Sequence, residues 1–226
     1  MSLRALSIAA AQGGALLRRI DAISGNLACA DMPGAHRLPR TGDFKHGILQ
    51  STLRDLDIAI EGDGFLRVLL PDGSAAFTRA GSLDRNDQGL LTADGLVLDP
   101  PLKVPPSISK LTIDPDGFVQ GLDSEAPRTL VPIGQIEVSR FENASGLEPI
   151  NRALFRASQA AGDRFDGRPG EEFGSIRQGY LESSTINPLR ELLDLAHAQR
   201  AFELNNRVIQ AADEVLQGIN NLRRRP

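Results

Sequence analysis

The chain has 226 residues, a formal net charge of −4 and one cysteine. The negative net charge provides no general positive field that would attract nucleic acid or an anionic membrane. A single cysteine excludes an internal disulfide framework and a cysteine-based metal site. The sequence also lacks an apolar run of transmembrane length and the charged and apolar regions of a cleaved secretory signal, so we expect any export to proceed without a cleaved signal peptide.

The N-terminal stretch predicts a long helix. Residues 3–30 contain no proline, and small or apolar residues recur at steps of three and four, the spacing of a seam that packs on another helix. Pro33 disfavours a helical Met32 and Gly34 permits a turn, so the helix should end before them. The seam residues are Leu6, Ala10, Gly13, Leu17, Ile20, Ser24 and Leu27.

The pattern changes to short strands in the middle of the chain. From Asp55 onward, short apolar segments alternate with glycine-containing turns such as GDG at 62–64 and PDG at 115–117. This spacing predicts an all-β sandwich or barrel over residues 53–142. Residues 35–52 and 143–186 show little periodicity and are predicted to be extended crossovers on either side of it.

The C-terminal stretch predicts a second long helix over residues 187–226. Asn187 can cap it, Pro188 suits its first position, and no glycine follows until Gly218. At 1.5 Å per residue, the run 188–222 would be about 52 Å long, more than a small globular domain can cover. Asn205 is a polar position that can set register. The seam residues are Leu195, Ala198, Phe202, Asn205, Ile209, Ala212, Leu216 and Ile219.

Together these patterns predict an α+β protein in which long N- and C-terminal helices form a coiled-coil-like stalk around a central all-β domain. The expected order is helix (1–34), crossover (35–52), β domain (53–142), crossover (143–186) and helix (187–226). The two seams are expected to form an assembly interface, either within one subunit or between subunits. Its predicted residues are Leu6, Leu17, Ile20, Leu27, Leu195, Phe202, Asn205, Ile209, Leu216 and Ile219.

No catalytic or metal-binding pattern emerges from the sequence. His36, His46 and His197 are not in HExxH or HxH spacing, and no G-x-S-x-G sequence occurs. The DRNDQG stretch at 84–89 begins like a calcium loop, but Gly95 stands where the closing glutamate would be. We therefore expect no enzyme activity, no cofactor and no bound metal.

The segment ISGNLACADMPGAHR at 23–37 resembles the rod signature of bacterial flagellar axial proteins, with matches at Asn26, Leu27, Pro33, Gly34 and Arg37. The segments LDIAIEGDGFLRV in the middle and RQGYLESSTINPLRELLDLAHAQRAFELNNRVIQAADEVL at 177–216 are similar to the same family. The chain thus resembles the flagellar basal-body rod proteins over nearly its whole length. Within that family the distal rod members are the nearest likeness, and proximal rod or other hook–basal-body members are the alternative.

The resemblance implies a structural subunit that polymerises through its terminal helices into a helical tube and transmits torque from motor to hook. Implied partners are further copies of the chain, other rod and hook proteins, the surrounding basal-body rings and the flagellar type III export apparatus, without nucleic acid. The implied location is the periplasm-spanning basal body.

One departure from the family and one different class of function remain open. Distal rod proteins carry an additional segment after the signature, whereas the connection from Arg37 to Asp55 is short here, so part of the family's inter-subunit contact would be missing. The alternative class is a β-sandwich module that binds a saccharide or peptide and is oligomerised by the helices. The absence of tryptophan offers little for such a binding platform.

Overall fold

The computed structural model describes residues 2–38, 44, 46–124, 129–151, 153–170 and 172–223. The chain forms two compact units. The first, called the helical unit below, comprises Met1–Ala28 and Asn187–Pro226, and the second, called the β unit, comprises Cys29–Ile186.

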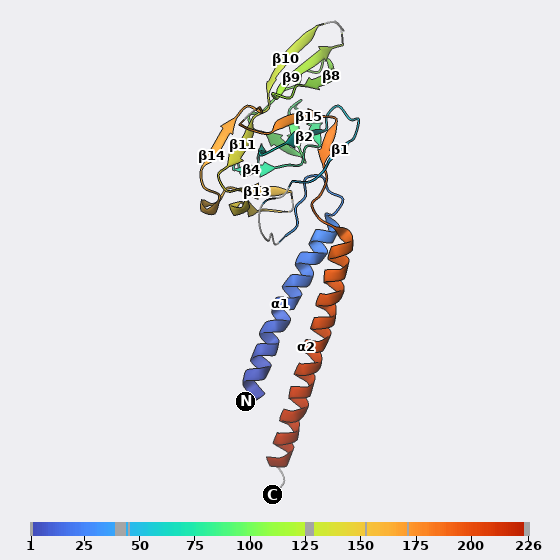
Figure 1. The fold of residues 1–226 in the computed structure, drawn as a ribbon, viewed down its shortest axis with the longest axis vertical. Helices are drawn as coiled ribbons and strands as arrows, with labels where there is room; N and C mark the ends of the chain where they lie inside the picture. The colour runs from blue at the N-terminus through green and yellow to red at the C-terminus, as the bar shows by residue number, and fades with distance from the viewer. Residues whose placement is uncertain are drawn as a thin grey trace. The chain divides into compact units, whose positions relative to one another are not determined.

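The helical unit consists of α1 (Ser2–Ala28) and α2 (Pro188–Arg223). The two helices run side by side in opposite directions (Figure 1). Asn187 caps α2, because its side-chain oxygen accepts a 3.1 Å hydrogen bond from the Arg190 backbone N–H. Proline at the first position of α2 leaves no helical hydrogen bond unmade there, which explains why this long helix begins at Pro188.

The prediction of a coiled-coil-like stalk is wrong. In the part of the chain that the structure describes, α1 and α2 accompany a large β-rich region, so the class is α+β without a coiled-coil stalk. A coiled coil needs large apolar side chains interlocking along its seam. Here small or polar residues such as Ala9 and Asn26 are buried in α1, whereas the predicted seam residue Leu17 is 48% exposed.

In its described residues the β unit is built from short strands and two 3-10 turns. The strands of its first half are β1 (Leu49–Ser51), β2 (Ile58–Glu61), β3 (Phe65–Leu69), β4 (Ala75–Thr78), β5 (Leu83–Arg85), β6 (Leu91–Ala93), β7 (Leu96–Leu98) and β8 (Ile108–Ile113). Those of its second half are β9 (Phe118–Asp123), β10 (Leu130–Gln135), β11 (Val138–Phe141), β12 (Glu148–Pro149), β13 (Leu154–Arg156), β14 (Arg164–Gly167), β15 (Ser175–Gln178) and β16 (Tyr180–Glu182). The 3-10 turns are η1 (Ala144–Gly146) and η2 (Gln159–Ala161).

The largest sheet of the described residues has the strand order β12-β13-β4-β3-β7-β6-β5, with β11 joining β3 and β14 joining β11. Strands β10, β9 and β8 form a second sheet, and the pairs β1–β16 and β15–β2 form two small ones. Residues 143–186, expected as a crossover, therefore supply β12 to β16; β12 pairs with β13, and β13 to β16 each pair with a strand from before residue 143. Their strands have two to four residues, too short to leave a periodic signal in the sequence.

Two clusters of buried side chains form the core of the β unit. Side chains alternate along a strand, so β3 sends Leu66 and Val68 into the larger aliphatic cluster and Phe65 into an aromatic one. In the aromatic cluster, Phe77 and Phe141 meet edge-on with ring centroids 4.8 Å apart. Five of the ten aromatic residues lie in this cluster, which leaves few for a binding platform.

A buried arginine connects strands and loops of the β unit. Arg79 pairs with the carboxylate of Glu182, and both side chains are 1% exposed. The same guanidinium donates hydrogen bonds to the carbonyl oxygens of Gly64 at 2.6 Å and Ile60 at 2.7 Å. Glu182 in turn accepts a 2.6 Å hydrogen bond from the Gly47 backbone N–H. A buried charge is tolerated only with such partners, so these contacts fix residues from both halves of the unit.

Candidate assembly interface

The contact between α1 and α2 is made largely by small and polar residues. Ala9, Ile23 and Asn26 are buried on α1, and Glu191, Ala198 and Asn205 are buried on α2. The three positions on α2 are seven residues apart, so they share one face of the helix. Small side chains allow the two backbones to approach closely.

Two polar contacts determine how the helices align. The side-chain amide of Asn26 donates a 3.1 Å hydrogen bond to the Glu191 carboxylate. The amide of Asn205 donates a 3.0 Å hydrogen bond to the Ala9 carbonyl oxygen. A Cβ atom at Gly13 would lie 3.1 Å from the same Asn205 nitrogen. One contact lies near the beginning of α2 and the other 14 residues later, which fixes the register between the helices.

A second apolar stripe on α2 lies beside the face that is buried against α1. Its members, spaced alternately three and four residues apart, are Ala201, Leu204, Val208, Ala211 and Val215, called the outer stripe below. Leu204 is 61% exposed, Val208 56% and Val215 58%. Burial of large aliphatic side chains is energetically favourable. This exposed row is therefore a surface suited to a further helix.

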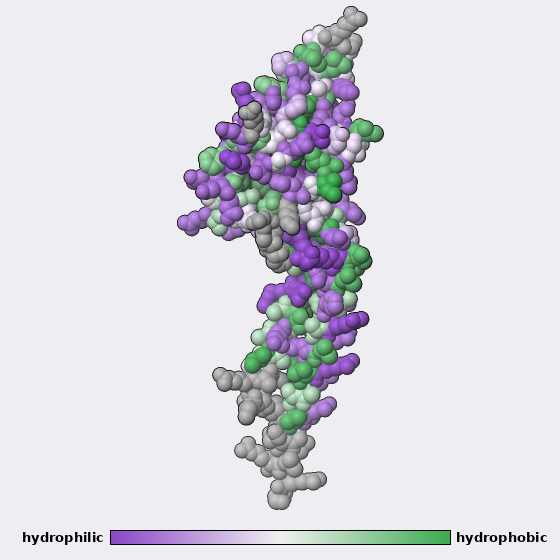
Figure 2. Space-filling view, viewed as in Figure 1, coloured by the Kyte–Doolittle hydropathy of each residue, from purple (hydrophilic) through white to green (hydrophobic). Residues whose placement is uncertain are grey.

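The outer stripe borders a groove between α1 and α2. The groove has a volume of about 840 Å³, and Ile8, Ala15 and Leu16 of α1 line it opposite Leu204 and Val208. Ile8 is 56% exposed. Figure 2 shows hydrophobic side chains along the helical unit among hydrophilic ones. An exposed apolar groove of this kind is typical of a protein–protein contact.

The structure places the predicted interface residues on different surfaces. On α2, Asn205 is buried against α1, and Leu195, Phe202 and Ile209 are partly buried on the same face. On α1, Ile20 and Leu27 are partly buried, and Leu17 is the half-exposed residue noted above. The side chains of three further predicted residues lie outside the described part of the structure: Leu6, Leu216 and Ile219.

The outer stripe was not among the residues predicted from the sequence. It has the same three–four spacing as the stripe that faces α1, so the signal was present. The helix α2 therefore carries two interleaved apolar stripes, one of which is buried against α1.

The rod-signature turn follows α1 within the β unit. Gly34 has a φ of +65°, and a Cβ atom there would lie 2.5 Å from the Ala80 backbone nitrogen. Its N–H donates a 2.8 Å hydrogen bond to the Glu182 carbonyl oxygen. Pro33 and Arg37 on either side are partly buried. The turn therefore requires glycine for two reasons, the backbone conformation and the lack of space.

Among the described residues no group of three or more histidine, cysteine, aspartate or glutamate side chains could hold a metal ion. In the same residues, neither helix combines the length and apolar character needed to cross a bilayer.

The chain matches two families of flagellar proteins. Residues 59–121 match the family described as the flagellar hook protein FlgE/F/G D1 domain. Residues 177–222 match the family described as the flagellar basal body rod FlgEFG protein C-terminal region. The first match lies within the β unit, and the second includes most of α2.

Proteins that are similar over most of this chain are named as flagellar basal-body rod proteins. The flagellar basal-body rod protein FlgG of Caulobacter vibrioides is 42% identical over 178 residues, which cover 76% of this chain and 67% of the relative. FlgG of Borreliella burgdorferi is 40% identical, covering 80% of this chain and 69% of the relative. The flagellar basal-body rod protein FlgF of Salmonella typhimurium is 31% identical, covering 83% of this chain and 73% of the relative. The chain therefore belongs to the flagellar basal-body rod protein family.

Proposed function

We propose that the chain is a structural subunit of the flagellar basal-body rod that polymerises through α1 and α2 into a helical tube and carries torque from the motor to the hook. Family membership supports the rod role. The FlgG relatives at 42% and 40% identity, compared with 31% for the FlgF relative, favour the distal part of the rod.

The observation that carries the polymerisation proposal is the outer stripe. One face of α2 already packs on α1, yet Leu204, Val208 and Val215 are each more than half exposed on another face. Burying one large aliphatic side chain contributes about 1.5–3 kcal/mol. A neighbouring helix that covers the stripe and the adjoining groove would therefore gain several such contributions at each contact.

Further exposed leucines suggest where a neighbouring copy binds. At the start of α2, Leu189 is 68% exposed, Leu192 50% and Leu193 57%. A contact between this group on one copy and the outer stripe of the next would join two different surfaces. Such heterologous contacts continue from copy to copy and produce a filament when the rotation does not close into a ring.

The proposal includes the wider assembly. The expected partners are other rod and hook proteins, the surrounding basal-body rings and the flagellar type III export apparatus, and the location is the periplasm-spanning basal body. Uncleaved export belongs to the same proposal, and N-terminal sequencing of subunits from isolated basal bodies would test it.

Electron microscopy of the full-length protein at increasing concentration tests the polymerisation. We expect tubes or filaments from the natural chain and none from a Leu204→Asp/Val208→Asp variant, since buried carboxylates would oppose helix contact. A Gln199→Asp/Gln210→Asp variant is the matched control, because both glutamines are exposed on another part of α2. Polymers from the Leu204→Asp/Val208→Asp variant would exclude the outer stripe as the contact.

A further inference from the structure

The β unit also carries two complementary surfaces. We propose that the segment Glu148–Pro149–Ile150 of one copy binds in a groove beside β5 of the next copy, with Glu148 pairing with Arg85. This inference rests on the proposed polymerisation and adds a second contact, between β units, to the helix contacts.

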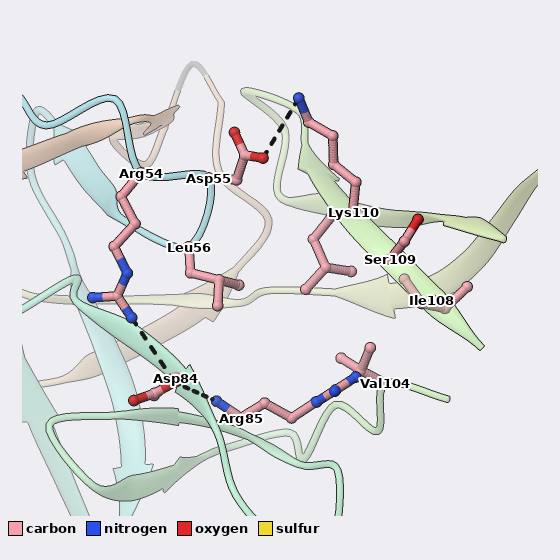
Figure 3. A pocket seen from close by; sticks show the side chains of 10 residues that line it. Arg54, Asp55, Leu56, Asp84, Arg85, Val104, Ile108, Ser109 and Lys110 are labelled. Atoms are coloured by element: carbon pink, nitrogen blue, oxygen red, sulfur yellow. Dashed lines mark hydrogen bonds and ion pairs between the residues drawn. The ribbon is translucent and has the colours of Figure 1, made fainter. Parts of the chain in front are cut away.

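The groove beside β5 has apolar walls and a charged rim. It has a volume of about 480 Å³, and its apolar lining includes Leu56, Val104 and Ile108 (Figure 3). Arg85 and Lys110 are among its charged residues. A ligand that fits this groove would combine an aliphatic side chain with a negative charge.

Four of the five charged residues that line the groove form ion pairs with one another, whereas the Arg85 side chain forms none with the described residues. Lys110 pairs with Asp55 at 3.5 Å, and Arg54 pairs with Asp84 at 3.8 Å. Figure 3 shows the Arg85 side chain extending away from Asp84. Among the described residues, no carboxylate forms an ion pair with the exposed Arg85 guanidinium. It is thus free to bind a carboxylate from another copy.

The Glu148–Ile150 segment carries groups that complement those of the groove. Glu148 and Pro149 are exposed, and Ile150 is 42% exposed. In the described structure the Glu148 carboxylate has no ion-pair partner either. One acidic and one aliphatic side chain, two residues apart, therefore match a groove with a spare arginine and apolar walls.

The segment is held in place before any partner binds. Leu147, directly before it, is 2% exposed within the aromatic cluster. The Ile150 backbone N–H donates a 2.9 Å hydrogen bond to the Leu154 carbonyl oxygen. The Asn151 side chain accepts hydrogen bonds from the backbone N–H groups of Ala153 and Leu154, both at 2.8 Å. Such preorganisation lowers the entropic cost of binding.

The sheet topology makes the contact directional. Strand β5 stands at one end of the strand order of the largest sheet, and β12, which contains Glu148, stands at the other. The two surfaces are therefore different, and joining them gives a heterologous contact that can repeat from copy to copy. Because both surfaces belong to this chain, a second copy is the partner that the observations favour.

Crosslinking between two variants of the full-length protein tests the contact. Both variants carry Cys29→Ser, which removes the natural thiol; one has Ser109→Cys in the groove and the other Pro149→Cys in the segment. After mixing and treatment with a bis-maleimide, we expect dimers that join the two variants in clear excess over dimers of either one. Replacing Pro149→Cys by Glu172→Cys, at another exposed position, should remove that excess.

A charge exchange on the same crosslinking variants tests the role of Arg85. Arg85→Glu or Glu148→Arg alone should lower the yield of mixed dimer by about fivefold, the change that an exposed ion pair can supply, and the two together should restore it. Absence of mixed dimers, or equal yields with Glu172→Cys, would overturn the proposal. Electron microscopy of the same samples separates the two ideas, since polymers without the crosslink would leave the proposed function standing.

Discussion

The side-chain amide of Asn26 donates a hydrogen bond of 3.1 Å to the carboxylate of Glu191, although 165 residues separate them along the chain. Both residues are fully buried in the helical unit. Glu191 lies in the first turn of α2, where the helix dipole favours a negative charge. The rod-signature residue Asn26 therefore has a structural role, holding the end of α1 against the beginning of α2.

Replacing Asn26 by leucine is expected to weaken the pairing of the two helices. The change removes a hydrogen bond to a buried charged group, which contributes about 1.5–3 kcal/mol. Urea unfolding followed by helical circular dichroism would measure the loss. Ser24→Leu, two residues away and exposed, is the control. Equal stability of the two variants would show that the Asn26–Glu191 hydrogen bond contributes nothing.

Gly13 and the adjacent Gly14 are expected to respond differently to a larger side chain. A Cβ at Gly13 would lie 3.1 Å from the Asn205 amide nitrogen, whereas one at Gly14 would have only the flexible end of Arg18 at 3.7 Å. Gly13→Leu should thus destabilise the helical unit by about 1–3 kcal/mol through overpacking. Gly14→Leu should be neutral or stabilising, because leucine favours a helix over glycine.

Thermal unfolding of both variants, followed by circular dichroism, would measure the difference. If Gly13→Leu unfolded at the same temperature as Gly14→Leu, the close approach at Asn205 would not constrain the helix pair.

The α+β class was predictable, because proline-free stretches with a helical period lie on either side of short segments bounded by turns. The coiled-coil-like stalk was a wrong prediction because the period of α1 fits two stripes equally well. Gly13 belongs to both, but one stripe includes Leu17 and the other includes Ala9 and Ile23, which are the buried residues. With alanines on several faces of α1, sequence alone could not choose between them.

The candidate sites differ in how much the sequence revealed. The outer stripe could have been found from its spacing alone. The groove beside β5 could not, since Arg85 and Ile108 line it from β5 and β8, two strands that pair with other strands and not with each other. The buried partnership of Arg79 and Glu182, 103 residues apart, was equally invisible.

Gly34→Ala is expected to destabilise the β unit by more than the same change at Gly73. Both glycines have positive φ, +65° and +80°, so alanine is strained at either by about 1–2 kcal/mol. Only at Gly34 would the new Cβ meet the backbone, 2.5 Å from the Ala80 nitrogen, while Gly73 has open space. Urea unfolding of the two variants would measure the additional cost, and identical midpoints would argue against a close approach at the signature turn.

Glu182→Gln is expected to be among the most destabilising conservative changes in the β unit. It would leave the buried Arg79 charge without its carboxylate, and breaking one partner of a buried pair costs about 3–5 kcal/mol. The surface pair of Arg177 and Glu61, 3.2 Å apart with side chains 48% and 55% exposed, provides the control. Glu61→Gln should cost at most about 1 kcal/mol and lose its effect in high salt, because exposed charges are screened.

Urea unfolding at low and high ionic strength would measure both variants. The loss in Glu182→Gln should persist in high salt, because water and ions do not reach a pair that is 1% exposed. A cost below about 1 kcal/mol for Glu182→Gln would mean that the carbonyl oxygens of Ile60 and Gly64 suffice to hold the Arg79 charge. The link between the two halves of the β unit would then depend on backbone pairing rather than on this ion pair.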